Sequence, residues 1–446
     1  MTLVTIGLSS FVTLIIAAFR SKLTTDGNNL TNTADPSLNL RIVFLWIFGL
    51  AVIVHISINT AIYVECIPFI STKSVEATFS LLSSIILILF LLIQLSFISY
   101  YRGIRFIQTT IVNFSCIFIL VANFVIWFNT FISDINVFHH GNDTVPRYSN
   151  ASYCFRTSKI QKGLAKHVTS FLIPKRMEFC ILASSFIFWF LRWSSDETNE
   201  KLNYYTNKHF RGGSTSVTEE GRHIIGQHIF AGAFGIFMNV PFFLTTVLLI
   251  FALNWESEDA ILALQIGEVL SSLCIILPIY VSSYHLKKYF CDSRRPEKLT
   301  ANEYLLILSS SGTMAYYMFG TVTAFTLPGN FTHLKTFLCT RIILMLETFL
   351  QTHFLIQIRR FRPKGQSSLF ISSGGVNLMM TNMNHWILNS TNKPSCHRNL
   401  ETKLVDCQSW LYIINILIPL MLFYRFFSGI SGYAIYYKFK PIVVGK

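Results

Sequence analysis

Charged side chains are scarce in this sequence. Asp, Glu, Lys and Arg make up 13% of its 446 residues, whereas hydrophobic residues make up 52%. Soluble domains carry about 25% charged residues, so the composition argues against a soluble domain. Apolar runs of about 18 residues or more recur along the chain, and runs of that length span a membrane as helices. The sequence therefore predicts an all-α polytopic membrane protein.

Motifs of enzymes and metal sites are missing as well. The nine cysteines form no C-x-x-C pair and no zinc-ligand spacing. No nucleotide-binding loop, H-E-x-x-H or G-x-S-x-G occurs in the sequence. We therefore expect that the protein is not an enzyme and needs neither a cofactor nor a metal.

The net charge of +14 raises the alternative of nucleic acid binding. The Lys and Arg residues, however, lie in short runs between apolar segments, which is the usual topology signal of membrane proteins. We therefore expect no nucleic acid partner.

Eleven membrane spans are expected in this chain. They cover residues 1–19, 42–64, 77–100, 105–132, 178–194, 224–253, 260–286, 303–326, 335–358, 369–389 and 409–433. Basic residues cluster in alternate connections and in the carboxy-terminal tail, which places these parts in the cytoplasm. The other connections carry glycosylation sequons at Asn142, Asn150, Asn330 and Asn389, as expected outside the cell. With eleven spans Met1 would lie outside, so either a helix precedes Met1 or the first segment inserts as a reversed anchor.

A polar pattern recurs in the two halves of the chain. Gln351, Arg359, Asn382 and Trp386 of the second half match Gln94, Arg102, Asn123 and Trp127 of the first in order and in similar spacing. A polar residue repeated at matching depth indicates a duplicated fold with a polar interior. We expect an amino-terminal half at 1–194, a polar cytoplasmic linker at 195–223 and a carboxy-terminal half at 224–446, related as parallel repeats.

Ionisable residues inside spans are costly and are functional candidates. Glu178 stands near the outer start of its span and could bind a cation or respond to external acid, or it could pair with Lys175 or Arg176. Glu268 and Glu347 are further intramembrane carboxylates. Glu347 could equally be a hydrogen-bonding group between helices, and Arg341 is a possible but not a well-placed partner for it. Arg425 stands near the inner end of the last span, where it could reach the lipid surface. His55, His353 and His385 are expected to be buried, each with helix contact as its more ordinary role.

The repeated amides carry no charge. Gln94, Asn123, Gln351 and Asn382 can order water in a narrow pore, or they can bond between helices. Cys396 and Cys407 share one expected external loop and are predicted to form a disulfide, with Cys66 and Cys154 as a weaker second pair.

Several of these segments resemble the otopetrin proton channels. The resemblance lies in FLLIQLSFISYYRG, FSCIFILVANFVIWFNTFISD, RMEFCILASSFIFWF, FLQTHFLIQIRR, NMNHWILNS and WLYIINILIPLMLFYRFFS. The last segment is the most specific, because it holds Pro419 and the run Phe423-Tyr424-Arg425. The resemblance extends from about residue 42 to residue 433, although residues 196–300 match only in hydropathy.

This resemblance implies two barrels of six helices in each subunit of a homodimer, with both termini cytoplasmic. It implies a plasma-membrane channel that is selective for protons, is opened by external acid and contacts membrane lipid, with sterol as one candidate. The family's first helix would be absent from this chain. Gln94 with Asn123, and Gln351 with Asn382 and Tyr424, would form the constrictions of the two halves. Glu178 and Asn415 would line the interface between them.

The first half departs from the family pattern, because Phe186 and Phe188 stand where a tyrosine matching Tyr424 is expected. Some otopetrins carry histidine where Asn415 stands. The alternative function is a proton-coupled secondary transporter with parallel repeats. A receptor or scaffold is disfavoured by the repeat.

Overall fold

The structure is a computed structural model, and it describes most of the apolar segments. The described residues are 2–24, 37–66, 74–101, 109–139, 166–192, 258–289, 301–326, 334–359, 368–391 and 407–439, with single positions between 233 and 244 and at 299 and 361. Nearly all of them are helical, as the composition predicts.

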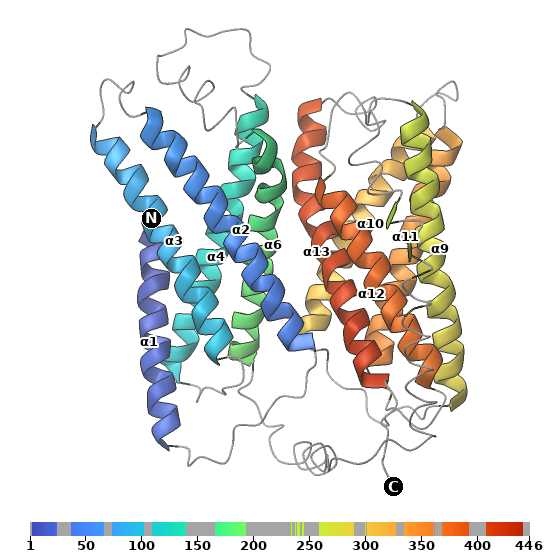
Figure 1. Ribbon diagram of the computed structural model, residues 1–446, viewed down its shortest axis with the longest axis horizontal. Helices are drawn as coiled ribbons and strands as arrows, with labels where there is room; N and C mark the ends of the chain where they lie inside the picture. The colour runs from blue at the N-terminus through green and yellow to red at the C-terminus, as the bar shows by residue number, and fades with distance from the viewer. Residues whose placement is uncertain are drawn as a thin grey trace. The chain divides into compact units, whose positions relative to one another are not determined.

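Ten long helices are described (Figure 1). They are α1 (Thr2–Thr24), α2 (Ser37–Cys66), α3 (Ser74–Tyr101), α4 (Thr110–His139), α6 (Lys166–Arg192), α9 (Glu258–Tyr289), α10 (Ala301–Thr326), α11 (Leu334–Ile358), α12 (Ser368–Thr391) and α13 (Cys407–Phe439). Each overlaps an expected span. The remaining expected span, 224–253, lies largely outside the described residues.

Six helical stretches of the described chain are both long and apolar enough to cross a membrane. They are Ser37–Cys66, Leu81–Tyr101, Thr110–Thr130, Gln265–Lys287, Leu334–Ile358 and Tyr412–Phe439. Because a helix of about 20 residues spans the hydrocarbon core, these stretches define a multi-pass membrane protein. The full number of eleven spans stays a prediction.

Helix α6 begins earlier than expected. The expected span starts at residue 178, whereas the helix starts at Lys166. Its first turns contain Lys166 and His167, and the low hydropathy of that stretch hides the helix from an apolar-run count. As a result, Lys175 and Glu178 both lie inside a helix, three residues apart, and so on one face.

The chain folds into two compact units. Unit 1 contains residues 1–191, 390–397 and 405–423, and unit 2 contains residues 192–389, 398–404 and 424–446. Helix α13 therefore contributes its first part to unit 1 and its second part to unit 2. The expected division into halves at 1–194 and 224–446 stays a prediction.

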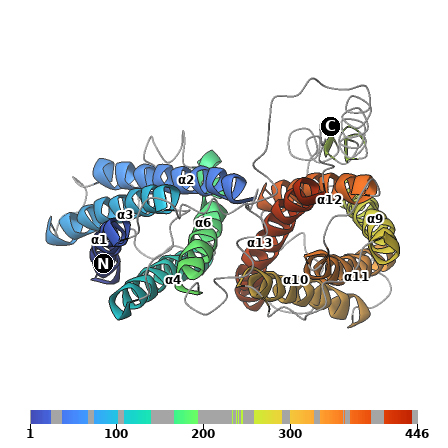
Figure 2. The ribbon, with the colours of Figure 1, turned by 90° about the horizontal axis from the view of Figure 1, so that it is seen from below.

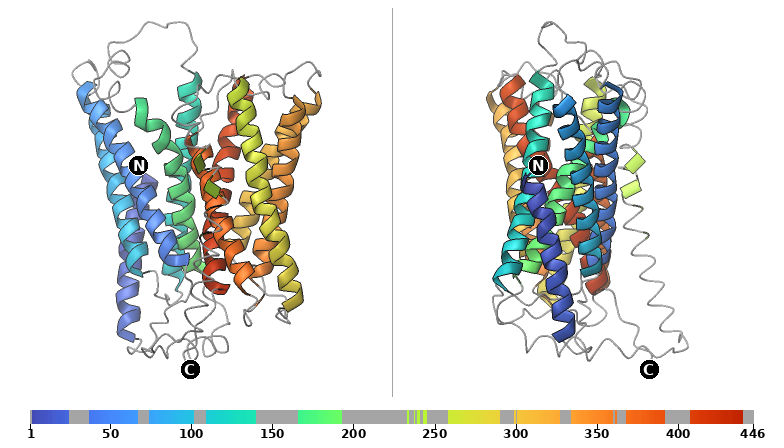
Figure 3. Two further views of the ribbon diagram at one scale, coloured as in Figure 1. Left: turned by 45° about the vertical axis from the view of Figure 1, so that its right-hand side comes forward. Right: turned by 90° about the vertical axis from the view of Figure 1, so that its left-hand side faces the viewer.

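In unit 1, α1 packs against α3 and α4, and α2 packs against α3. A glycine allows the closest approach of α1, because a Cβ at Gly7 would lie 2.9 Å from the Phe90 ring and 3.2 Å from Ala122. Phe11 of α1 also contacts Phe90, with ring centroids 5.7 Å apart. The helices of this unit run roughly along one direction (Figure 3).

In unit 2, α11 packs against both α9 and α10. Helix α12 lies between α9 and α13 when the unit is viewed from below (Figure 2). Two glycines let α12 and α13 touch, because a Cβ at Gly375 would lie 2.8 Å from the Gly432 carbonyl oxygen and 2.7 Å from the Tyr436 nitrogen. Small residues of this kind are typical of closely packed membrane helices. The crossing brings the polar side chains of α12 and α13 together with those of α11.

Candidate functional site

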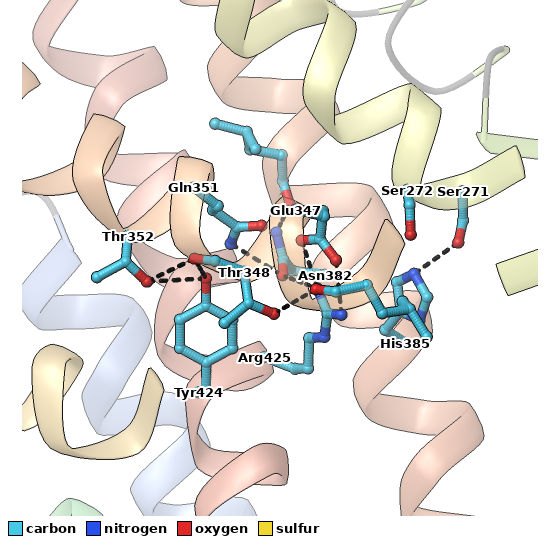
Figure 4. Close-up of polar contacts among 12 residues, drawn as sticks. Ser271, Ser272, Glu347, Thr348, Gln351, Thr352, Asn382, His385, Tyr424 and Arg425 are labelled. Atoms are coloured by element: carbon cyan, nitrogen blue, oxygen red, sulfur yellow. Dashed lines mark hydrogen bonds and ion pairs between the residues drawn. The ribbon is translucent and has the colours of Figure 1, made fainter. Parts of the chain in front are cut away.

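A buried ion pair lies in unit 2 (Figure 4). Arg425 of α13 donates two hydrogen bonds to Glu347 of α11, from Nη1 to Oε1 at 2.7 Å and from Nη2 to Oε2 at 2.8 Å. Both side chains are fully buried. This two-point geometry is the strongest form of a guanidinium–carboxylate contact, and a pair so fully removed from water needs it.

The ion pair is hydrogen-bonded to one of the repeated amides, Asn382, which is in turn hydrogen-bonded to another, Gln351. Gln351 Nε2 donates to Asn382 Oδ1 at 3.1 Å, and Arg425 Nη1 lies 3.5 Å from the same oxygen. The Asn382 Nδ2 atom donates to the Leu378 carbonyl of its own helix at 2.8 Å, which fixes the amide orientation. Gln351 and Asn382, which the sequence places in one expected constriction, are therefore in direct contact.

Tyr424, the neighbour of Arg425 on α13, also forms hydrogen bonds with α11. Its hydroxyl donates to the Thr348 carbonyl oxygen at 3.0 Å and accepts a hydrogen bond from Thr352 Oγ1 at 3.2 Å. Arg425 also donates from Nη2 to the hydroxyl of Tyr317 on α10 at 3.2 Å. Four helices, α10 to α13, thus contribute to one buried polar network.

The expectation about Arg425 is wrong, whereas the one about Arg341 agrees with the structure. Arg425 does not reach a lipid surface, because its side chain is fully buried against Glu347. Arg341, as expected, is not the partner of Glu347. Its guanidinium carbon lies 4.7 Å from the Phe337 ring centroid and 5.0 Å from that of Tyr316, contacts that are typical of an arginine stacked on aromatic rings.

The three histidines differ in their surroundings. His385 of α12 is buried, and its Nε2 lies 2.6 Å from Ser271 Oγ of α9 (Figure 4). His55 is buried beside Asn59, at 3.2 Å. His353 is exposed, so its expected burial is wrong. Glu268 is half-buried, and its backbone carbonyl accepts hydrogen bonds from Ser271 and Ser272 at 2.8 and 2.9 Å.

The corresponding amides of unit 1, Gln94 and Asn123, have different hydrogen bonds. Gln94 and Asn123 are fully buried. Asn123 Nδ2 donates to the Ile119 carbonyl of its own helix at 3.1 Å. Among the described residues, Asn123 Oδ1 and both amide atoms of Gln94 have no hydrogen-bond partner. The two amides are therefore not bonded to each other, in contrast to Gln351 and Asn382. The expected counterparts of Tyr424 are Phe186, which is buried, and Phe188, which is exposed.

A second buried ion pair lies in unit 1. Lys175 Nζ lies 3.3 and 3.2 Å from the two carboxylate oxygens of Glu178, and it donates to Ser390 Oγ at 3.0 Å. Lys175 and Glu178 are 2% and 1% exposed, so the pairing that the sequence offers as the ordinary interpretation of Glu178 is present. Asn415 Nδ2 is buried and has no hydrogen-bond partner among the described residues. The expected place of Glu178 and Asn415 between the two halves stays a prediction.

One disulfide cysteine is described. Cys66, at the end of α2, is disulfide-bonded, and its partner is none of Cys116, Cys180, Cys274 and Cys339, which are free. Cys154 and Cys396 lie outside the described residues, and the side chain of Cys407 does too. The predicted bond between Cys396 and Cys407 therefore stays a prediction. No group of three or more metal-binding side chains occurs within the described part of the chain.

The helices and the site together define a multi-pass membrane protein whose spans enclose charged and amide side chains in direct contact. The family model for otopetrin matches residues 133–426, about two thirds of the chain. The chain belongs to the otopetrin family, which is a family of membrane channels. A comparison with curated proteins found no match.

The matched part contains most of the site. Glu178, Glu347, Gln351, Asn382, Asn415, Tyr424 and Arg425 all lie within it. Gln94 and Asn123 lie before it, so their likeness to the second half rests on the internal repeat and on their burial.

Proposed function

We propose that this protein is a proton-selective channel of the plasma membrane that conducts protons inward when the extracellular side is acid. Its membership of a channel family supports ion conduction. The choice of the proton rests on one observation: at the buried network of unit 2, side chains from three helices meet in direct hydrogen bonds at Asn382.

This contact favours protons over other ions. Gln351 Nε2 and Asn382 Oδ1 are 3.1 Å apart, so a hydrated metal ion has no room between these atoms. A proton passes such a point by exchange along hydrogen-bonded groups and water. Asn382 Oδ1 accepts hydrogen bonds from both Gln351 and Arg425, the latter at 3.5 Å, so this oxygen has no free lone pair with which to coordinate a metal cation.

The two sets of amides would act at matching places. Gln94 and Asn123 in the first half, and Gln351, Asn382 and Tyr424 in the second, would order water at narrow points. Glu178 would respond to external acid, because it is a buried carboxylate paired with Lys175, and protonation of the carboxylate would weaken that pair. We further propose a homodimer in contact with membrane lipid, with a cytoplasmic carboxy terminus and N-linked glycans outside.

Recording from cells at stepped external pH, together with flux into liposomes that contain the purified protein, tests the proposal. A proton channel gives acid-evoked current whose reversal potential moves by about 59 mV per pH unit, with no other solute present. Current or uptake that requires a co-substrate would instead identify a proton-coupled transporter. Current that follows the sodium or potassium gradient would contradict proton selectivity. Protein-free liposomes control for leak.

A further inference from the structure

Helix α9 contains a proline in its interior, at Pro278. In a regular α-helix the nitrogen of residue 278 would donate to the carbonyl oxygen of Cys274. Proline has no N–H group, so this carbonyl loses its helical partner. In a membrane span no water from the hydrocarbon core replaces the bond, and another protein group must do so.

A side chain from α12 takes the place of the missing bond. Asn377 donates from Nδ2 to the Cys274 carbonyl oxygen. Asn239 donates from Nδ2 to Asn377 Oδ1 at 2.6 Å, and Thr381 donates to Asn239 Oδ1. Asn377 and Asn239 are 6% and 4% exposed. Both the nitrogen and the oxygen of the Asn377 amide are thus hydrogen-bonded, in a buried cluster of three side chains and one backbone carbonyl.

The helix surfaces around this cluster are in close contact. A Cβ at Gly374 would lie 2.7 Å from Ser282 Oγ and 3.8 Å from the Pro278 carbonyl oxygen. Further along α12, His385 is bonded to Ser271 of α9. Gly374, Asn377 and His385 therefore fasten α12 along α9, on a side of α12 that differs from the side where Gly375 touches α13 (Figure 2).

We propose that Asn377 is a positioning residue for the proton path. By binding the Cys274 carbonyl that Pro278 leaves without a partner, it holds α12 at the height along α9 where Asn382 meets Gln351 and Arg425. Asn382 follows Asn377 by little more than one helical turn, so a displacement of α12 at Asn377 reaches Asn382 almost undiminished. This inference rests on the proposed proton conduction.

The test removes the bond and then restores it from the backbone. Asn377→Leu keeps the side-chain size and removes both the donor to the Cys274 carbonyl and the acceptor of Asn239, so we expect proton flux per surface molecule to fall at least to roughly a tenth, because two buried hydrogen bonds are lost. Pro278→Ala supplies a backbone N–H to the Cys274 carbonyl, which replaces the hydrogen bond that Asn377 donates. The double variant Pro278→Ala/Asn377→Leu should therefore recover a clear part of the flux, although the bond from Asn239 stays absent.

Asn384→Leu is the matched control. Like Asn377→Leu, it replaces a buried asparagine of α12 with leucine. The Asn384 amide, however, has no hydrogen-bond partner among the described residues. The proton flux of Asn384→Leu should therefore be the same with and without Pro278→Ala. A normal flux in Asn377→Leu, or an absence of recovery in the double variant, would overturn the proposal. Failure of both Asn377→Leu and the double variant to reach the surface would also overturn it, because the restored backbone bond should allow folding.

A thermal-unfolding cycle on the purified proteins separates this inference from the proposed function. If the bond exists, Asn377→Leu lowers the melting temperature more in the wild-type background than in the Pro278→Ala background, where only the bond from Asn239 is lost. This result, together with an absence of proton flux in the wild type, would reject conduction and the positioning role while retaining the contact. Equal losses in both backgrounds would reject the contact itself.

Discussion

At the scale of single residues, the pair of Glu347 and Arg425 is the most demanding feature of the protein. Two full charges are removed from water, and among the described residues their mutual hydrogen bonds at 2.7 and 2.8 Å and the contacts to Asn382 and Tyr317 offset that loss. Removing one partner of a buried pair costs about 3–5 kcal/mol, whereas replacing both with apolar groups is often tolerated.

We therefore expect Arg425→Met to lower the melting temperature of the purified protein more than the double variant Glu347→Leu/Arg425→Met does. In the single variant the Glu347 carboxylate stays buried without its cation. Thermal unfolding in detergent measures the difference. A double variant less stable than the single one would show that Glu347 has another partner that compensates its charge.

Glu178 poses the corresponding test in unit 1. Glutamine resembles a protonated carboxyl group and cannot ionise, so Glu178→Gln holds the site with Lys175 permanently in the form that acid would produce. We expect the half-maximal response of the current to move to a higher external pH, with normal surface expression. Recordings across external pH, with surface biotinylation, measure this shift. An unchanged pH response would remove Glu178 from the sensing role.

Sequence alone identifies such residues but not their partners. Glu347, Arg425 and Glu178 stand out because charges are rare inside apolar spans. Arg425 lies 78 positions from Glu347, and no local spacing connects the two. Glu178 is three residues from Lys175, and that pair follows from helical periodicity. No sequence pattern singles out Asn377, because its role depends on a proline in another helix.

At the scale of helices, glycine determines how closely α12 approaches α13. A Cβ at Gly375 would meet backbone atoms, the nitrogen of Tyr436 at 2.7 Å and the oxygen of Gly432 at 2.8 Å. Backbone atoms of a packed helix cannot move aside individually. A Cβ at Gly429 would also be close to α12, but its nearest neighbour is Met383 Cε at 2.9 Å, the end of a flexible side chain.

These two glycines make a matched pair of variants. We expect Gly375→Ala to reduce the yield of folded protein and its melting temperature, because α12 and α13 must separate. Gly429→Ala should behave nearly like the wild type, because Met383 can turn away. Size-exclusion chromatography and thermal unfolding measure both variants. Equal losses of yield and melting temperature in the two variants would show that α12 and α13 can shift apart at either glycine without added cost at Gly375.

The helices themselves could largely be predicted. Ten of the eleven expected spans overlap described helices, because long apolar runs in a membrane protein form helices. The start of α6 could not be predicted in the same way, since its first turns are polar. Which helices touch was also not predictable, because Gly375 and Gly432 look no different in the sequence from other glycines in the spans.

At the scale of the whole molecule, the internal repeat relates two sets of amides that the structure treats differently. Gln351 and Asn382 are bonded to each other and to the ion pair. Gln94 has no partner among the described residues, and neither does Asn123 Oδ1. Buried polar groups in proteins nearly always have a partner, often an ordered water. The first-half amides are therefore suited to hold water, whereas the second-half amides also hold helices together.

This difference allows one substitution to separate conduction from folding. Leucine at Gln94 or Asn123 removes groups that can hold water in a narrow apolar space, and the path there should lose its water. Because these amides make no hydrogen bond to another helix among the described residues, we expect normal surface expression and a strongly reduced proton flux per molecule. Leucine at Gln351 or Asn382 should reduce flux too, but it also breaks helix contacts worth roughly 1–2 kcal/mol, so surface expression should fall. Current recording with surface biotinylation distinguishes these results, and normal flux per molecule in all four variants would exclude the amides from the proton path.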